Sequence, residues 1–141
     1  MGCVQVAVLA RLAAMRALIV DDSSAARAQA RMALEDAMDR LGCDWTIDEA
    51  ANGIEAVRLL ASAEVHVLLV DLRMPDMTGL EVLAFWRTRG SAAPRRALIV
   101  SQDISSRDRE KGLAGGAAGF LLKPVSSAVL AEALAGLDAA P

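Results

Sequence analysis

The sequence has few of the residues that build soft-ligand metal centres, and it has no excess of positive charge. Two of its 141 residues are cysteine and one is histidine, and Cys3 and Cys43 are too far apart to form a Cys-x-x-Cys pair. These counts argue against a structural zinc site and favour a reducing, cytoplasmic environment. Fifteen Lys and Arg against eighteen Asp and Glu give a formal net charge of −3. We therefore expect no binding to nucleic acid through bulk electrostatics.

Long apolar segments are also missing. Residues 1–14, MGCVQVAVLARLAA, are apolar, but Arg11 interrupts them, and they are too short to cross a bilayer. They also lack the basic start of a secretion signal, so we expect no membrane anchor. Two interpretations stay open: the domain starts at Met15, or the first residues form an added helix with one apolar stripe of Val4, Val8, Leu12 and Met15.

The composition does not have the low hydrophobicity of a disordered chain. The sequence is 55% hydrophobic and 23% charged, with four prolines, which is too apolar and too weakly charged for an unfolded segment. Its length suits one domain. We place this domain at residues 15–141, behind an N-terminal extension of residues 1–14.

What the sequence does contain is a set of short, continuous apolar runs that each end at a polar residue. They are Ala17–Val20 before Asp21, Val67–Val70 before Asp71, Ala97–Val100 before Ser101, and Phe120–Leu122 before Lys123. Continuous runs of this length are typical of strands buried on both faces, as in parallel sheets covered by helices. A weaker, alternating run at residues 45–49 predicts an edge strand.

The intervals between these runs are long enough for helical crossovers and carry helix-start signals. Ser23 or Ser24 and Ser105 or Ser106 are candidate helix starts, Asn52-x-x-Glu55 and Thr78-x-x-Glu81 have capping spacing, and the last helix is expected to run from about Ser126. Gly42 and Gly90 predict the ends of the first and third helices. The pattern predicts an α/β fold with a doubly wound, five-stranded parallel sheet.

The polar residues that end the central strands are expected to lie together. In an open parallel sheet, ligands bind beyond the carboxyl ends of the strands, which here carry Asp21, Asp22, Asp71, Ser101 and Lys123. Two unit charges about 4 Å apart repel by about 4 kcal/mol at an effective dielectric constant near 20, so the three carboxylates need positive charge nearby. Lys123 supplies one charge, and Mg²⁺ suits the remainder because it binds carboxylates and phosphate together. The cluster predicts phosphoryl transfer to a carboxylate.

Four sequence segments resemble one known family. LIVDDS at 18–23, LLVDLRMPDMTGLEVL at 68–83, Ser101 and FLLKP at 120–124 are similar in order and spacing to the receiver domain of two-component response regulators, in particular the single-domain, chemotaxis type. The resemblance implies a flavodoxin-like (βα)₅ receiver fold with strand order 2-1-3-4-5. It also implies a signalling phosphoprotein whose only catalysis is its own phosphorylation and dephosphorylation.

The resemblance also implies roles for the acidic residues. Asp71 is expected to be the phosphoacceptor, forming an aspartyl phosphate with a phosphoryl group from a sensor histidine kinase or a histidine phosphotransfer protein. Asp21 and Asp22 are expected to hold Mg²⁺ together with Asp71 and the backbone carbonyl of Arg73.

Three further residues are implied to bind the phosphoryl group or to switch with it. Ser101 and Lys123 would contact the phosphoryl oxygens, and Phe120 would turn inward when Ser101 moves. This motion would change the face formed by the fourth helix, the fifth strand and the fifth helix, where a downstream protein target or a second copy of the chain would bind. No output domain is recognised after the fifth helix, so we expect a stand-alone receiver or the receiver part of a longer protein.

The sequence departs from the family pattern at the expected mouth of the site. Gln102 is bulky where the family usually has a small residue, so it is a candidate for narrowing access to the phosphoryl group. Arg73 and Asp103 each lie two residues beyond a site residue. Our hypothesis is that they pair across the site and shield the acyl phosphate from water.

Other interpretations remain open for single residues and for the function. Asp22 alone fits a helix cap, Ser101 an ordinary strand end, Phe120 a core residue, and His66 a structural residue. A Mg²⁺-dependent phosphohydrolase of the haloacid dehalogenase type is a second functional class, although it needs an aspartate where Arg73 stands. A scaffold that binds partners without phosphorylation is the third.

Overall fold

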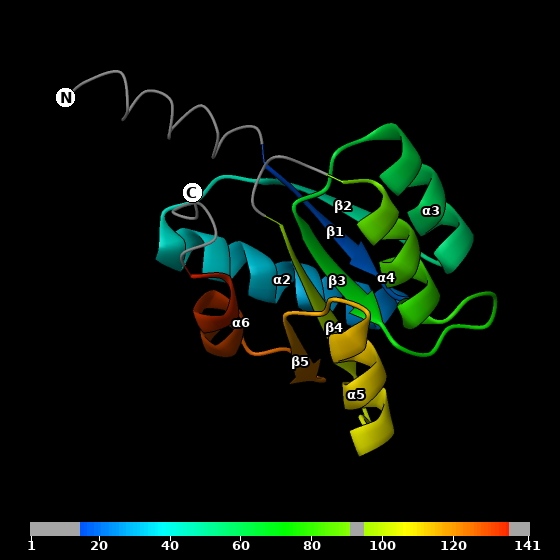
Figure 1. The fold of residues 1–141 in the computed structure, drawn as a ribbon. Coiled ribbons are helices and arrows are strands. Elements are labelled where there is room, and N and C mark those ends of the chain that lie inside the picture. The colour runs from blue at the N-terminus through cyan, green and yellow to red at the C-terminus, as the bar shows by residue number, and fades with distance from the viewer. Residues whose placement is uncertain (1–14, 91–94, 136–141) are drawn as a thin grey trace.

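A five-stranded parallel sheet forms the centre of the computed structural model, which describes residues 15–90 and 95–135. The strand order is β2-β1-β3-β4-β5, and every neighbouring pair is parallel. The strands are β1 (Arg16–Val20), β2 (Thr46–Ala50), β3 (Val67–Asp71), β4 (Arg96–Ser101) and β5 (Gly119–Leu122). This arrangement confirms the predicted fold class and strand order (Figure 1).

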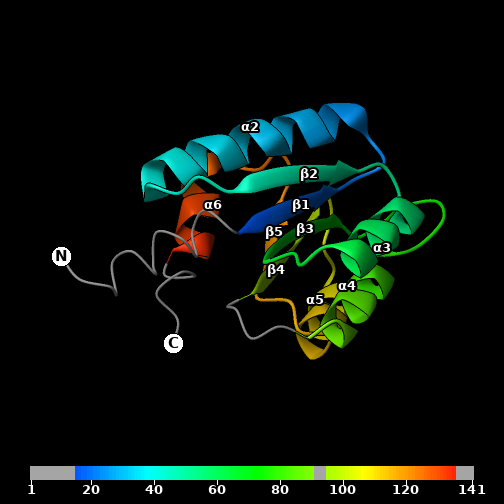
Figure 2. The same ribbon diagram turned by 90° about the horizontal axis from the view of Figure 1, so that it is seen from above.

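Five helices cover the two faces of the sheet. They are α2 (Ser24–Leu41), α3 (Gly53–Ser62), α4 (Gly79–Thr88), α5 (Ser106–Ala114) and α6 (Ser127–Leu134). Figure 2 shows α2 and α6 on one face and α3, α4 and α5 on the other. Each face has its own core cluster, so alternate residues of one strand belong to different cores: Ile19 packs under α2, and Leu18 under α3 and α4. This two-sided burial explains why the strand sequences are continuously apolar.

The helices begin where the capping residues predict. Ser23, Asn52, Thr78, Ser105 and Ser126 are the N-caps, and each side chain accepts a hydrogen bond from a backbone N–H of the first turn. Such caps satisfy donors that have no partner within the helix.

The ends of some elements differ from the predicted positions. α2 stops at Gly42 as predicted, in the left-handed region with φ of 71°, whereas α4 ends at Thr88 with Arg89 as its C-cap, before Gly90. The edge strand begins at Thr46, because the buried Trp45 packs into the core below α2 instead of pairing in the sheet.

Met15 and His66, which lie just before β1 and β3, have structural roles. Met15 is 2% exposed and belongs to the core under α2, while the other members of the predicted N-terminal stripe lie outside the described residues. His66 is buried just before β3, and its Nδ1 accepts a hydrogen bond from the backbone N–H of Arg16 (3.1 Å). Burial lowers the pKa of His66, which favours the neutral ring that this hydrogen bond requires.

Candidate functional site

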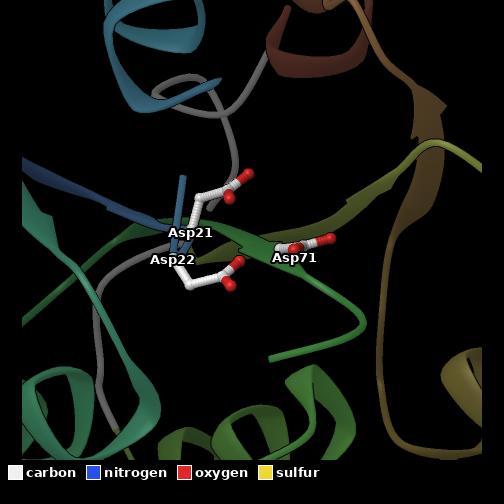
Figure 3. Close-up of side chains that lie close together, drawn as sticks. All are labelled: Asp21, Asp22 and Asp71. Carbon is white, nitrogen blue, oxygen red and sulfur yellow. The ribbon is translucent and has the colours of Figure 1, made fainter. Parts of the chain in front are cut away.

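Three carboxylates meet at the carboxyl ends of β1 and β3. Asp21 and Asp22 follow β1, and Asp71 is the last residue of β3. An oxygen of each side chain lies within 4.8 Å of an oxygen of the others (Figure 3). The chain leaves β1 toward one face of the sheet and β3 toward the other, which opens a crevice between these two strands. This geometry confirms the prediction that the three carboxylates lie close together.

Asp21 is held by backbone and side-chain donors. It is 5% exposed, and its Oδ1 accepts from the backbone N–H of Ser23 (2.9 Å). Its Oδ2 lies 2.5 Å from Nζ of Lys123, and its backbone carbonyl accepts from Nη1 of Arg27 (2.7 Å). Asp21 therefore has a fixed orientation and a resident counter-charge.

Asp71 is buried beside the same ammonium group but at a greater distance. It is 7% exposed, and its Oδ1 lies 3.6 Å from Nζ of Lys123. Burial raises the pKa of Asp71, and the neighbouring charge of Asp21 raises it further, while Lys123 acts in the opposite direction. The carboxylate is therefore the less neutralised of the two, which suits a group that must take part in a reaction.

The backbone packs closely around Asp71 because α4 begins with a glycine. A Cβ atom on Gly79 would lie 2.3 Å from the backbone oxygen of Asp71, and the N–H of Gly79 donates to the carbonyl of Leu72 (2.9 Å). Asp76, in the same loop, caps α3 by accepting from the N–H groups of Gly53 and Ile54. These bonds lower the pKa of Asp76. The loop after Asp71 is thus anchored at both ends by residues without a place in the carboxylate cluster.

Ser101 and Lys123 line the same cavity as the three carboxylates. Ser101 is 4% exposed, and its carbonyl accepts from the backbone N–H of Lys123 (3.0 Å). A cavity of about 370 Å³ brings together the strand-end residues and the loop residues, lined by Asp21, Asp22, Ser23, Asp71, Arg73, Ser101, Gln102, Asp103 and Lys123. Gln102 and Asp103 are exposed at its mouth. All five strand-end residues singled out from the sequence line this one cavity.

The bridge across the mouth differs from the predicted one. Nη1 of Arg73 donates to the backbone carbonyl of Asp103 (2.9 Å), and Nη2 pairs with Oδ2 of Asp108 (3.1 Å). The carboxylate partner of Arg73 is therefore Asp108, because Asp108 is oriented by the capping box of α5, in which it accepts from the N–H of Ser105 (3.0 Å). These Ser105 bonds, with a smaller effect of Arg73, lower the pKa of Asp108. The Ser-x-x-Asp spacing at residues 105–108 is the sequence signal for this residue, which was not singled out from the sequence.

Phe120 is a residue of β5 whose side chain packs against α5, and it does not line the cavity. Its side chain is half-buried, and a Cβ atom on Gly112 would lie 2.7 Å from its ring. The guanidinium of Arg109 lies 5.3 Å from the ring centroid, within cation–π range. The structure therefore places Phe120 against α5.

The acidic cluster has the donor chemistry of a magnesium site. Hard divalent cations prefer carboxylate oxygens, and Mg²⁺ keeps several waters, for which the exposed Asp22 leaves room. The neighbouring side chains add one positive charge through Lys123, which leaves the cluster net negative. The three carboxylates therefore fit a divalent cation.

Within the described residues, no helix is both long enough and apolar enough to pass through a membrane.

Comparisons with known proteins agree with this geometry. The model of the response regulator receiver domain family matches residues 17–135. The chain is 34% identical over 125 residues to the response regulator MprA of Mycobacterium ulcerans, covering 89% of this chain and 49% of that protein. It is 33% identical over 121 residues to a chemotaxis protein CheY homolog of Campylobacter jejuni, covering 85% of this chain and 89% of that protein. The chain thus spans about half the length of relatives such as MprA.

Solved structures show the same fold. The chemotaxis protein CheY4 of Vibrio cholerae superposes with a TM-score of 0.73 at 30% identity, covering 86% of this chain and 97% of that chain. The receiver domain of the NarL response regulator of Mycobacterium tuberculosis gives a TM-score of 0.74 at 29% identity, covering 92% and 99%. The chain therefore belongs to the response regulator receiver domain family.

Proposed function

We propose that this receiver accepts a phosphoryl group on Asp71 and signals through the change that follows. The observation that supports this best is the placement of Asp71, buried at the end of a central strand, 3.6 Å from the ammonium of Lys123 and beside two further carboxylates. A carboxylate confined in this way is available as a nucleophile, and the Lys123 ammonium beside it can stabilise added negative charge.

The reaction is a transfer to a carboxylate oxygen. An Oδ atom of Asp71 forms a bond to phosphorus while the bond from phosphorus to the donor breaks, and a phosphohistidine donor leaves as imidazole after taking up a proton. Lys123, which now contacts both Asp21 and Asp71, pairs with the transferred group. The hydroxyl of Ser101 donates to one of its oxygens. Water attack on phosphorus later releases phosphate and restores the Asp71 carboxylate.

The metal in this proposal is Mg²⁺. Asp21, Asp22 and Asp71, with the backbone carbonyl of Arg73, would hold it. When bound, it neutralises negative charge shared by the carboxylates and the phosphoryl oxygens.

The Arg73 bridge supports a proposal on the lifetime of the phosphorylated form. Arg73 spans the mouth of the cavity to the Asp103 carbonyl and the Asp108 carboxylate, and Gln102 lies exposed beside it. These groups would restrict the approach of water to the acyl phosphate.

The partners follow from the same proposal. A sensor histidine kinase or a histidine phosphotransfer protein would supply the phosphoryl group, and a downstream protein would bind the face of α5, β5 and α6. Exposed apolar side chains on these elements support that surface: Leu113, Leu122 and Val129. Phe120, packed under α5, would transmit the change. Formation of a homodimer, a stand-alone role and a cytoplasmic location stay predictions.

Intact mass spectrometry tests the proposed function. The protein is incubated with acetyl phosphate and Mg²⁺, with an Asp71→Asn variant and a sample containing a chelator in parallel. We expect one phosphoryl group per wild-type chain and none in either control. No adduct on the wild type would favour the scaffold that acts without phosphorylation, and repeated release of phosphate from small esters would favour a phosphohydrolase. A phosphohydrolase of the haloacid dehalogenase type needs an aspartate at the position of Arg73, and its absence there supports the receiver.

A further inference from the structure

The side chain of Gln29 connects α2 to the segment that follows β5. Its Nε2 donates to the backbone carbonyl of Val125 (2.8 Å), and the backbone N–H of Val125 donates to its Oε1 (3.0 Å). The two bonds use the donor and the acceptor of the amide at once, so they fix its orientation. The partners are 96 residues apart in sequence, so this pairing is a feature of the tertiary structure alone.

These bonds hold the backbone two residues beyond Lys123. Val125 is 4% exposed and belongs to the core under α2 and α6. On the other side, the backbone N–H of Lys123 donates to the carbonyl of Ser101 (3.0 Å). Lys123 therefore lies in a short segment fixed by β4 at one end and by Gln29 at the other.

Core packing and hydrogen bonding both restrain this segment, and the hydrogen bonds supply the directional part. Gln29 lines a cavity of about 360 Å³ between α2 and the segment, together with Asp21, Asp71, Lys123 and Val125. The α2 wall of this cavity also carries Ala25, Ala26 and Ala30. Apolar packing of such short side chains is not directional. The amide of Gln29 adds a directional contact between α2 and the segment.

We propose that Gln29 is a positioning residue for Lys123. By holding Val125, it sets the place of the ammonium group 2.5 Å from Asp21 and 3.6 Å from Asp71. Its effect on the rate of phosphoryl acceptance rests on the proposed function, whereas its effect on the place of Lys123 does not. Misplacement of a catalytic group by about 1 Å lowers rates by as much as about a hundredfold.

The lysine content of the chain allows a direct measurement. Only Lys111 and Lys123 occur in the sequence, and Lys111 is exposed on α5. Protein labelled with carbon-13 at lysine Cε therefore gives two NMR signals, which a Lys111→Arg variant assigns. We expect Gln29→Met to move the Lys123 signal toward that of exposed Lys111, and Lys111 to stay unchanged. Gln29→Asn withdraws the amide by one methylene and should act in the same way, which covers the case in which Gln29→Met does not fold.

Arg31→Met is the matched control. Arg31 lies on the same helix and also bonds a distant backbone carbonyl, that of Ile47 (3.0 Å), while pairing with Glu49 (2.6 Å). The variant should lower stability without moving the Lys123 signal. If the Lys123 signal stays in place in folded Gln29 variants, or moves equally in Arg31→Met, the proposal is wrong.

The rate of phosphorylation by acetyl phosphate with Mg²⁺ is measured on the same samples. We expect it to fall about tenfold in Gln29→Met and to stay at the wild-type value in Arg31→Met. An unchanged rate in a Gln29 variant whose Lys123 signal has moved would overturn the link to the reaction. A wild-type protein that takes up no phosphoryl group would overturn the proposed function, while the NMR signals would still decide the role of Gln29.

Discussion

Asp71 carries an electrostatic penalty that its neighbours only partly offset. It is buried next to Asp21, and both effects raise its pKa, while Lys123 lies nearer to Asp21 than to Asp71. A group kept charged at such a place destabilises the fold at neutral pH, and in functional sites such instability is retained for the chemistry it permits.

Replacing Asp71 with asparagine should therefore stabilise the protein without metal. Because the folded-state pKa is raised, the penalty is present at neutral pH, where the carboxylate is ionised, and vanishes below about pH 4, where the unfolded state is protonated too. We expect Asp71→Asn to unfold a few degrees higher at pH 7 and the difference to shrink as the pH falls. Thermal unfolding followed by circular dichroism measures this. A variant less stable than wild type at pH 7 would contradict it.

At the scale of elements, the loop after β3 links the carboxylate cluster to two helices. The loop after β3 is anchored to α3 through Asp76 and to the start of α5 through Arg73. The latter contact joins a loop next to the carboxylates to a helix of the α5–β5–α6 face. A change at the cavity therefore has a physical path to that face, since Arg73 and Asp108 would move together.

Arg73 bonds the backbone of Asp103 and not its side chain, so substitutions at these two residues should have different effects. Arg73→Asn removes the guanidinium, whereas Asp103→Ala keeps the backbone carbonyl that accepts from it. We expect Arg73→Asn to shorten the lifetime of the phosphorylated form about fivefold, which corresponds to about 1 kcal/mol in the barrier, and Asp103→Ala to leave it nearly unchanged. The loss of the phosphoryl adduct over time, followed by intact mass, measures both. A lifetime unchanged in Arg73→Asn would contradict the shielding, and an equal shortening in both variants would show that the Asp103 carboxylate takes part in it.

The parts of the site that follow from strand topology were predictable from the sequence, and the contacts made by long side chains were not. The strand-end residues were predicted to meet because parallel strands share one edge, which topology alone requires. The bridges of Gln29 to Val125 and of Arg73 to Asp108 were not predicted. They depend on where long side chains from separate elements reach after packing, and nothing in the local sequence specifies that. The start of β2 was misplaced by one residue because Trp45 packs into the core instead of pairing in the sheet.

At the scale of the whole molecule, the site and the core belong to one cooperative unit. β1 and β3 contribute to both core clusters and end at the three carboxylates. Unfolding of the sheet therefore separates Asp21 and Asp22 from Asp71. Any ligand that requires all three binds the folded state alone, so its binding free energy adds to the free energy of unfolding.

Magnesium should accordingly raise the unfolding temperature of the wild-type protein. With free Mg²⁺ at a hundred times its dissociation constant, the gain is about 2.7 kcal/mol, or roughly 5–10 °C for a domain of this size. Asp22→Asn should lose most of the rise at little cost to stability without metal, because Asp22 is the exposed member of the cluster. Asp44→Asn, an exposed acid just before the edge strand, should keep the full rise. Thermal unfolding with and without Mg²⁺ measures all three proteins. A rise that survives in Asp22→Asn, or is lost in Asp44→Asn, would show that the cation binds elsewhere on this acidic chain.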